Sequence, residues 1–210
     1  LPVDAACQVQ ALRPDLLTAP APRFDDVLAE AKKGRVVWPL RAPHVLMSFF
    51  TLLANHGAPF PVTRHTQIDS TAARDVIAAM QSLGASGPLG SALGGTGIAV
   101  SSGTKYPEIC TDFALWVASS DIQRGLYSQN NGQPGNAVAW GDKSVNAPVG
   151  GLYNNTRMTH EAAWLRPRHA GYMAFQEDAS EILLDVLREK TTPDAAIPAL
   201  QNRFDESFYA

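Results

Sequence analysis

The chain has 210 residues, of which 45% are hydrophobic and 18% charged, and its formal net charge is -3. This is enough to bury a core as one large domain or two small ones. No basic run is longer than Lys32-Lys33, so we expect no nucleic-acid partner. The longest apolar stretches, 45–54 and 109–118, contain polar residues and are shorter than the roughly 20 residues that span a bilayer.

Up to residue 83, apolar spacing predicts two strands and three helices. The strands are 1–12 and 36–40. The helices are 24–31, 45–55 and one that the Asp69-Ser70 cap begins. The stretch 84–90 is the richest in Gly, Pro and Ser and predicts a junction between parts of the chain.

The second half continues the alternation with a strand at 97–101 and a helix that begins at 105–108, where Pro107 suits a first helical position. Another helix is expected from Asp121. The pattern is helical over 152–189, with interruptions at Pro167 and Gly171, and again in the segment that starts at Pro193. Buried stripes are predicted for these helices at Ile109, Phe113, Trp116 and Val117, at Ile182, Leu183, Val186 and Leu187, and at Ile197, Leu200, Phe204 and Phe208. Strands that alternate with longer helices favour α/β layers.

The stretch 94–135 contains a glycine-led strand, a small-polar turn, the helix start Lys105-Tyr106-Pro107-Glu108, an aromatic-rich helix, an S-x-x-x-Q helix and a loop with small residues and proline. In this order, these elements resemble the family-1 extracellular solute-binding proteins, which include maltose- and multiple-sugar-binding proteins. Residues 1–17 resemble that family's crossover strand and the turn after it. Residues 24–28 resemble its T-W-D-E-L helix start, and 175–208 its last helical pair.

The resemblance implies an α/β, periplasmic-binding-protein-like fold of type II, mainly the second lobe, with the first lobe largely missing. It divides the chain into a second-lobe segment at 1–86, a segment at 87–150 that packs toward the first lobe, and C-terminal helices at 151–210 that pack on the second lobe. It implies capture of a sugar for an ABC-type importer, with permease subunits in the membrane as partners. No cofactor, metal or covalent chemistry is expected, and the location is periplasmic or extracellular, soluble or lipid-anchored.

Sugars present apolar C–H faces ringed by hydroxyls, so a site needs aromatic faces and hydrogen-bonding side chains. By their positions in the resemblance, the candidate ligand-binding residues are Asp4, Gln8, Trp38, Gly95, Thr96, Gln133, Tyr172 and Gln176. Each also has a purely structural interpretation: Trp38 in the core, Gln133 as a turn cap, Asp4 paired with an arginine. The glycines around Gly95 lack the spacing of a phosphate loop, which favours backbone clearance before a strand.

Two rival functions stay open. The first is a truncated interaction module that forms a homodimer and binds no solute. The second is a small carbohydrate-acting hydrolase, which needs two convergent carboxylates; Asp25-Asp26 and Glu177-Asp178 are adjacent in sequence and point apart on a helix. His160-Glu161 lacks the second histidine of a zinc site. Cys7 and Cys110 lie in apolar settings typical of inert thiols, and whether they pair is left open.

Overall fold

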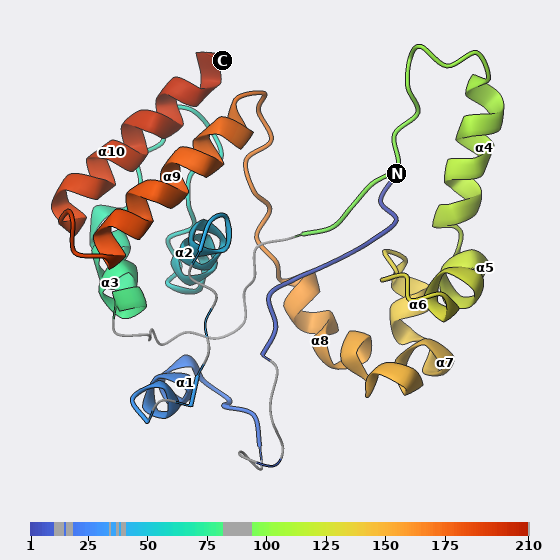
Figure 1. Ribbon diagram of the computed structural model, residues 1–210, viewed down its shortest axis with the longest axis horizontal. Coiled ribbons are helices and arrows are strands. Elements are labelled where there is room, and N and C mark those ends of the chain that lie inside the picture. The colour runs from blue at the N-terminus through green and yellow to red at the C-terminus, as the bar shows by residue number, and fades with distance from the viewer. Residues whose placement is uncertain are drawn as a thin grey trace. The chain divides into compact units, whose positions relative to one another are not determined.

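The structure is a computed structural model that describes residues 1–10, 15, 19–33, 35–36, 38, 41–81 and 94–209. The chain forms two compact units (Figure 1). Unit 1 combines Leu1–Val9 with Leu93–Ala163, and unit 2 combines Gln10–Ala92 with Trp164–Ala210. The chain therefore passes from one unit to the other near residues 9, 92 and 163, whereas the sequence analysis predicts segment boundaries after residues 86 and 150.

Unit 2 consists of helices, and its C-terminal pair packs on helices from the first half of the chain. Its elements are α1 (Phe24–Ala31), α2 (His44–Asn55), α3 (Ser70–Gln81), α9 (Tyr172–Leu187), α10 (Pro193–Glu206) and the 3-10 turn η3 (Ser207–Tyr209). The predicted cap of α3 is confirmed, since Asp69 Oδ1 accepts the backbone N–H groups of Thr71 and Ala72, both at 3.0 Å. Figure 1 shows α9 and α10 side by side.

An aromatic cluster holds the core of unit 2 together. Phe60, in the loop between α2 and α3, is only 2% exposed. Its ring centroid lies 4.7 Å from that of Phe50, 5.7 Å from Phe175 and 5.1 Å from Phe204. These rings come from α2, α9 and α10, so one loop residue joins three helices through edge and tilted ring contacts.

Unit 1 is built from shorter helices around a small core. Its elements are α4 (Pro107–Ala118), α5 (Ser120–Ile122), the π-helical turn η1 (Gln123–Tyr127), α6 (Ala137–Gly141), α7 (Lys143–Asn146), the 3-10 turn η2 (Ala147–Val149) and α8 (Leu152–Glu161). The core is Ala5, Ala139, Trp140, Val145 and Tyr153. Asn146 joins α6 to α8, because its Nδ2 donates to Trp140 O at 2.8 Å and its Oδ1 accepts Asn154 N–H at 2.9 Å.

The predicted α/β, periplasmic-binding-protein-like fold is wrong for this structure. Across the described residues the elements are helical, and β-structure is limited to two isolated antiparallel bridges, Pro2 with Gly97 and Ala6 with Gly94. Residues 1–6 pair with 94–98, which overlap only in part with the predicted strand at 97–101, and two isolated bridges do not make a sheet; residues 11 and 12 of the strand predicted at 1–12 lie outside the described residues. Of the strand predicted at 36–40, the described positions 36 and 38 are not in a strand, and the rest lies outside the described residues, as does the junction at 84–90.

The helix predictions fare better. The predicted span 24–31 is α1, and 45–55 differs from α2 by one residue. In α9 and α10 the predicted stripes face the core, with Leu183, Val186, Leu200 and Phe204 buried. The stripe predicted for α4 is mostly wrong: Val117 is buried, but Ile109, Phe113 and Trp116 are 68%, 56% and 47% exposed. Unit 1 offers this side of α4 no packing surface.

Truncation of Phe60 tests the role of the aromatic cluster. We expect Phe60→Ala to lower the free energy of unfolding of unit 2 by about 3–5 kcal/mol, because it leaves a cavity against three helices. Urea unfolding followed by circular dichroism measures the loss. Val62→Ala is the matched control: Val62 lies in the same loop but is 50% exposed, so its loss should stay within about 0.5 kcal/mol.

Candidate functional site

The candidate site in unit 1 is built on a backbone pairing between the two stretches of sequence that make up this unit. We call residues 1–6 the N-terminal strap. Its backbone pairs with 94–98: Val3 N donates to Thr96 O at 3.0 Å, Gly94 N to Ala6 O at 2.8 Å and Ile98 N to Leu1 O at 2.8 Å. The pairing holds the strap in an extended conformation, so that alternate side chains point to opposite sides.

Three predicted ligand residues lie together along this pairing. Thr96 Oγ1 donates to Asp4 Oδ2 at 3.2 Å. Gly95 has a φ of 145°, and a Cβ at this position would lie 2.6 Å from the carbonyl oxygen of Asp4. The prediction that this glycine provides backbone clearance is confirmed, because any side chain here would push the strap away.

The loop after η1, which carries Gln133 and Gly135, also contacts the strap. Gln133, a fourth predicted residue, donates its Nε2 N–H to Ala5 O. A Cβ on Gly135 would lie 2.9 Å from the backbone nitrogen of Asp4, so the loop and the strap are in close backbone contact. Gln123, fully buried, accepts Gly135 N–H at 2.8 Å and donates to Val117 O at 2.9 Å, which anchors the loop to the end of α4.

A small pocket of about 80 Å³ opens where strap, loop, α6 and α8 meet. Its lining is Ala5, Gly135, Ala137, Trp140, Arg157, His160 and Glu161. The centroids of the Trp140 and His160 rings are 4.7 Å apart, and Arg157 Nε donates to Glu161 Oε1 at 2.6 Å. Positions 157, 160 and 161 share one face of α8 by i, i+3, i+4 spacing, so a short helix brings a cation, an imidazole and a carboxylate to one opening.

Two buried polar atoms of unit 1 have no hydrogen-bond partner among the described residues: Asp4 Oδ1 and His160 Nε2. Trp140 differs, since its indole N–H donates to Pro134 O at 2.6 Å. Burial raises the pKa of Tyr153, and the negative charge of Asp4 raises it further. Unsatisfied buried polar atoms are costly, so atoms of this kind are sites where a polar ligand can gain free energy.

The other predicted residues are placed elsewhere. Gln8 follows the strap in unit 1 and is half-buried. Trp38 belongs to unit 2, where its ring meets Phe24 of α1 at 5.1 Å and its indole N–H donates to Ser48 Oγ at 2.9 Å. Trp38 therefore has the structural role given as its alternative interpretation, because it links α1 to α2.

Tyr172 and Gln176 also lie in unit 2, on the buried face of α9. Gln176 Oε1 accepts from Arg166 Nη1 at 3.1 Å. Burial raises the pKa of Tyr172 to about 12. The structure thus groups Asp4, Gly95, Thr96 and Gln133 in unit 1 and places Trp38, Tyr172 and Gln176 among packing residues of unit 2.

Sequence reasoning missed the residues that line the pocket. Trp140 lies in a stretch where no helix was predicted, and α6 is only five residues long. His160-Glu161 was considered only as a zinc motif. The available signal was Arg157-x-x-His160-Glu161, which puts three polar side chains on one helical face.

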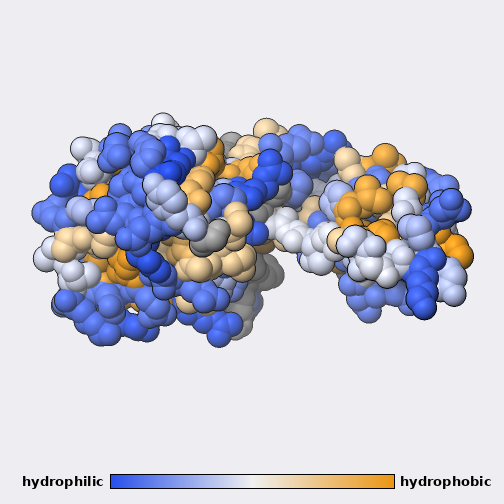
Figure 2. Space-filling model, turned by 90° about the horizontal axis from the view of Figure 1, so that it is seen from above, coloured by the Kyte–Doolittle hydropathy of each residue, from blue (hydrophilic) through white to orange (hydrophobic). Residues whose placement is uncertain are grey.

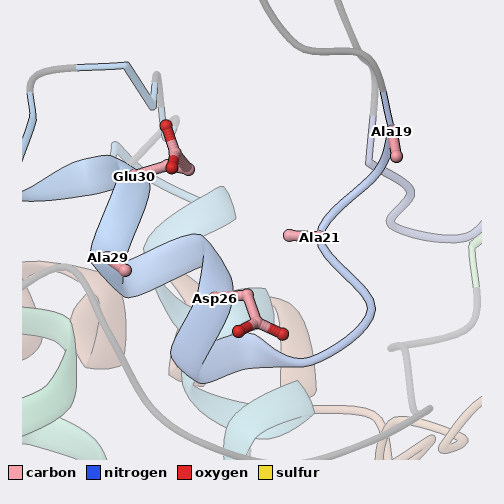
Figure 3. Close-up of a pocket in the computed structure, with 5 residues that line it drawn as sticks. All are labelled: Ala19, Ala21, Asp26, Ala29 and Glu30. Atoms are coloured by element: carbon pink, nitrogen blue, oxygen red, sulfur yellow. The ribbon is translucent and has the colours of Figure 1, made fainter.

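A second, larger hollow of about 190 Å³ lies in unit 2 between α1 and the segment before it (Figure 3). Figure 3 shows Asp26 and Glu30 on α1, with Ala19 and Ala21 across from them. The hollow is lined by two carboxylates, Asp26 and Glu30, so it is the place where the site of a glycoside hydrolase could lie. However, hydrogen bonds and charges from Lys33 and Arg35 hold the pKa of Glu30 below its usual value, whereas a general acid needs a raised one.

The described residues contain no cluster of three His, Cys, Asp or Glu side chains that could hold a metal ion. Both cysteines are free thiols and partly buried, and burial raises the pKa of Cys7. No described helix is long and apolar enough to cross a membrane.

No protein-family model matches the chain, and no curated protein matches it. The resemblance to solute-binding proteins therefore stays a prediction.

Substitution of Gly95 tests the strap. We expect Gly95→Ala to weaken the pairing by about 2 kcal/mol or more, because the methyl group meets the Asp4 carbonyl and the left-handed φ is strained. Hydrogen exchange of the Val3 and Ile98 amides measures it and should speed up. Gly103→Ala is the control, since a Cβ there comes no closer than 3.6 Å to a neighbour. Unchanged exchange in Gly95→Ala would contradict the role assigned to the strap.

The stability of unit 2 should depend on the protonation of His169. This ring stacks on Phe208 at 3.8 Å, its Nε2 lies 2.6 Å from Ser207 Oγ, and burial lowers its pKa. Because the pKa of His169 is lower in the folded than in the unfolded chain, the unfolded chain takes up a proton first as the pH falls. The contribution of His169 to the free energy of unfolding is therefore complete above the unfolded-state pKa of about 6.5 and is lost as the pH drops below it. Urea unfolding against pH should show this slope in the native chain and in His56→Gln, but reduced in His169→Gln.

Proposed function

We propose that this chain is a solute-binding component of an ABC-type importer and that it captures a small polar solute, a sugar, at the pocket of unit 1. The observation that carries the proposal is the convergence of an indole ring, an imidazole and an Arg–Glu pair on one small pocket, built by four separate segments of the unit. Five of the eight residues predicted for ligand binding lie in the same unit, and two of them meet at the Asp4–Thr96 hydrogen bond, although none of the eight lines the pocket.

The pocket's groups match the chemistry of a sugar. Trp140 is only 5% exposed and its indole N–H already donates to Pro134 O, so it lines the pocket as a small apolar wall. Arg157 has further N–H donors, and Glu161 has a second oxygen that can accept from a hydroxyl. His160 contributes its ring to the lining of the pocket. Exposed donors and acceptors beside a small apolar wall can hydrogen-bond the hydroxyls at one edge of a sugar ring.

Capture of this kind needs no covalent chemistry. The pocket contains one carboxylate, Glu161, which is paired with Arg157, so it lacks the second carboxyl group of a glycoside hydrolase. We therefore favour binding and release over turnover. In the proposal, permease subunits in the membrane receive the solute, and the protein works in the periplasm or outside the cell.

The size of the pocket sets the expected affinity. Its volume of about 80 Å³ is well below the roughly 300–1,000 Å³ of sites that enclose a small molecule. Only one edge or face of a sugar ring can be covered. We therefore expect this chain by itself to bind sugars weakly, with a Kd on the order of 1 mM.

Nuclear magnetic resonance titration with neutral mono- and disaccharides tests the proposal, read at the indole N–H of Trp140. Saturable shifts are expected for a sugar and not for a linear polyol. Arg157→Gln should raise the Kd by about tenfold, because a charge-assisted hydrogen bond is lost. Arg203→Gln is the matched control: Arg203 is also ion-paired and similarly exposed, 46% against 43%, but lies in unit 2.

Two results would count against this function. If no sugar shifts the Trp140 resonance at any concentration, the pocket is not a sugar site. If Arg157→Gln and Arg203→Gln weaken binding equally, the solute binds elsewhere. A micromolar Kd for this chain would overturn the expectation of weak affinity, although not the site itself.

A further inference from the structure

The turn η3 follows α10 and is fastened to the rest of unit 2 by its side chains. The ring of Phe208 stacks on that of His169, with centroids 3.8 Å apart and 16° between the planes. Ser207 Oγ lies 2.6 Å from His169 Nε2. The guanidinium of Arg64, in the loop between α2 and α3, lies 3.6 Å from the centroid of the Tyr209 ring. Each residue of η3 therefore contacts a side chain from a distant part of the sequence, and His169 makes two of these contacts.

The hydrogen bonds of Ser207 determine which nitrogen of His169 carries the proton. Ser207 Oγ lies 2.6 Å from the carbonyl oxygen of Phe204, and a carbonyl has no proton to donate, so the hydroxyl donates to it. A hydroxyl has one proton, so Ser207 Oγ must accept from His169, and Nε2 is the protonated nitrogen. Nδ1 then carries a lone pair. It is buried and has no hydrogen-bond partner among the described residues.

Aromatic rings surround His169. Besides the stacked Phe208, Tyr172 lies 6.2 Å and Phe204 5.8 Å from it between centroids, both nearly perpendicular to the imidazole. Burial in this setting lowers the pKa of His169. The neutral imidazole therefore suits the site better than the charged one.

The elements packed around His169 supply no free counter-charge among the described residues. Their titratable and charged groups are Arg64 and His65 in the loop between α2 and α3, Arg166 and Arg168 before α9, Tyr172, Glu177 and Asp178 on α9, and Arg203, Asp205, Glu206 and Tyr209 on α10 and η3. Asp178 and Glu206 form ion pairs with Arg203, and Asp205 accepts the backbone N–H of His65. Glu177 is exposed, on the side of α9 away from Tyr172.

A second proton on His169 destabilises the arrangement in which its ring is stacked on Phe208 and bonded to Ser207, which we call closed. The proton would make Nδ1 a charged N–H donor in a buried position without an acceptor, which is costly. The imidazolium regains hydration if it separates from η3. Separation breaks the stack and the hydrogen bond together, because one ring makes both.

We propose that η3 is a pH-dependent latch, which is closed on His169 while this ring is neutral and detaches when the ring is protonated, before unit 2 unfolds. The proposal does not rest on sugar binding, because none of these residues lines the pocket of unit 1. Phe204 is fully buried and packs on Phe208 at 5.2 Å, so opening removes part of its cover. Figure 2 views the molecule from the side where α10 ends in Figure 1, and there the surface of unit 2, on the left, is mainly hydrophilic. Opening therefore adds apolar surface to this side.

The pH range of the latch follows from the sign of the pKa change. In the open state His169 has the ordinary pKa of about 6.5, and in the closed state its pKa is lower. The closed state is therefore favoured fully above about pH 6.5. Below this value each unit of pH raises the ratio of open to closed chains by up to about tenfold, until the closed-state pKa is reached.

Amide hydrogen exchange followed by nuclear magnetic resonance tests the latch in the full chain. Exchange rates are compared between about pH 7.5 and pH 5.5, each relative to an unstructured peptide at the same pH. In the native chain the protection of the Ser207 and Phe208 amides should fall by about fivefold to tenfold towards the lower pH. The amides of Leu52 and Leu53, buried in α2, should keep their protection over this range.

Two histidine variants assign the effect to one ring. In His169→Gln the protection of η3 should no longer depend on pH, since glutamine stays neutral. His56→Gln is the matched control, because His56 is an exposed histidine at the end of α2 in the same unit and should keep the native pH dependence. Phe208→Ala should raise the pKa of His169 towards about 6.5, read from its ring resonances, because the ring loses its cover. Val62→Ala should leave that pKa unchanged.

Four results would overturn the latch. The first is a pKa of His169 that is not lowered in the native chain, and the second is protection at η3 that does not change with pH. The third is a pH dependence that persists in His169→Gln, since a different group then acts. The fourth is a loss of protection in η3 and α2 at the same pH, because unit 2 then unfolds as a whole.

Discussion

The backbone pairing between the N-terminal strap and residues 94–98 is the constraint on which unit 1 depends. It joins segments about 90 residues apart and places Asp4 and Ala5 against the loop that carries Gln133 and Gly135. Without it Ala5 would not close the pocket, and the small core around Trp140 would lose one side. Glycine at position 95 makes the approach possible, because no other side chain fits beside the Asp4 carbonyl.

The two units achieve stability by different means. Unit 2 buries a large aromatic core, with Phe60 in contact with rings from three helices. Unit 1 has a core of only five residues and relies on buried amides, Gln123 and Asn146, which satisfy backbone groups in its turns. Small cores leave more surface without a partner. The pocket and the exposed apolar side chains of α4, Ile109, Phe113 and Trp116, are both found in this unit.

The small pocket of unit 1 limits what the proposed function can achieve. In that proposal a sugar gains binding energy as its faces are covered, and a pocket of about 80 Å³ is large enough for only one of them. The carboxylates of the α1 hollow, Asp26 and Glu30, are instead neutralised by neighbouring cations.

Local signals in the sequence determined the helices α1, α2, α9 and α10 and the cap at Asp69, whereas the need for glycine at position 95 comes from the distant carbonyl of Asp4. Periodicity, caps and steric limits act within a few residues, so they can be read without a fold. Only the tertiary structure decided that residues 1–6 and 94–98 form two bridges instead of a sheet. It likewise decided that Ile109, Phe113 and Trp116 of α4 are exposed and that Trp140 meets His160, because each of these depends on which distant segment supplies the partner.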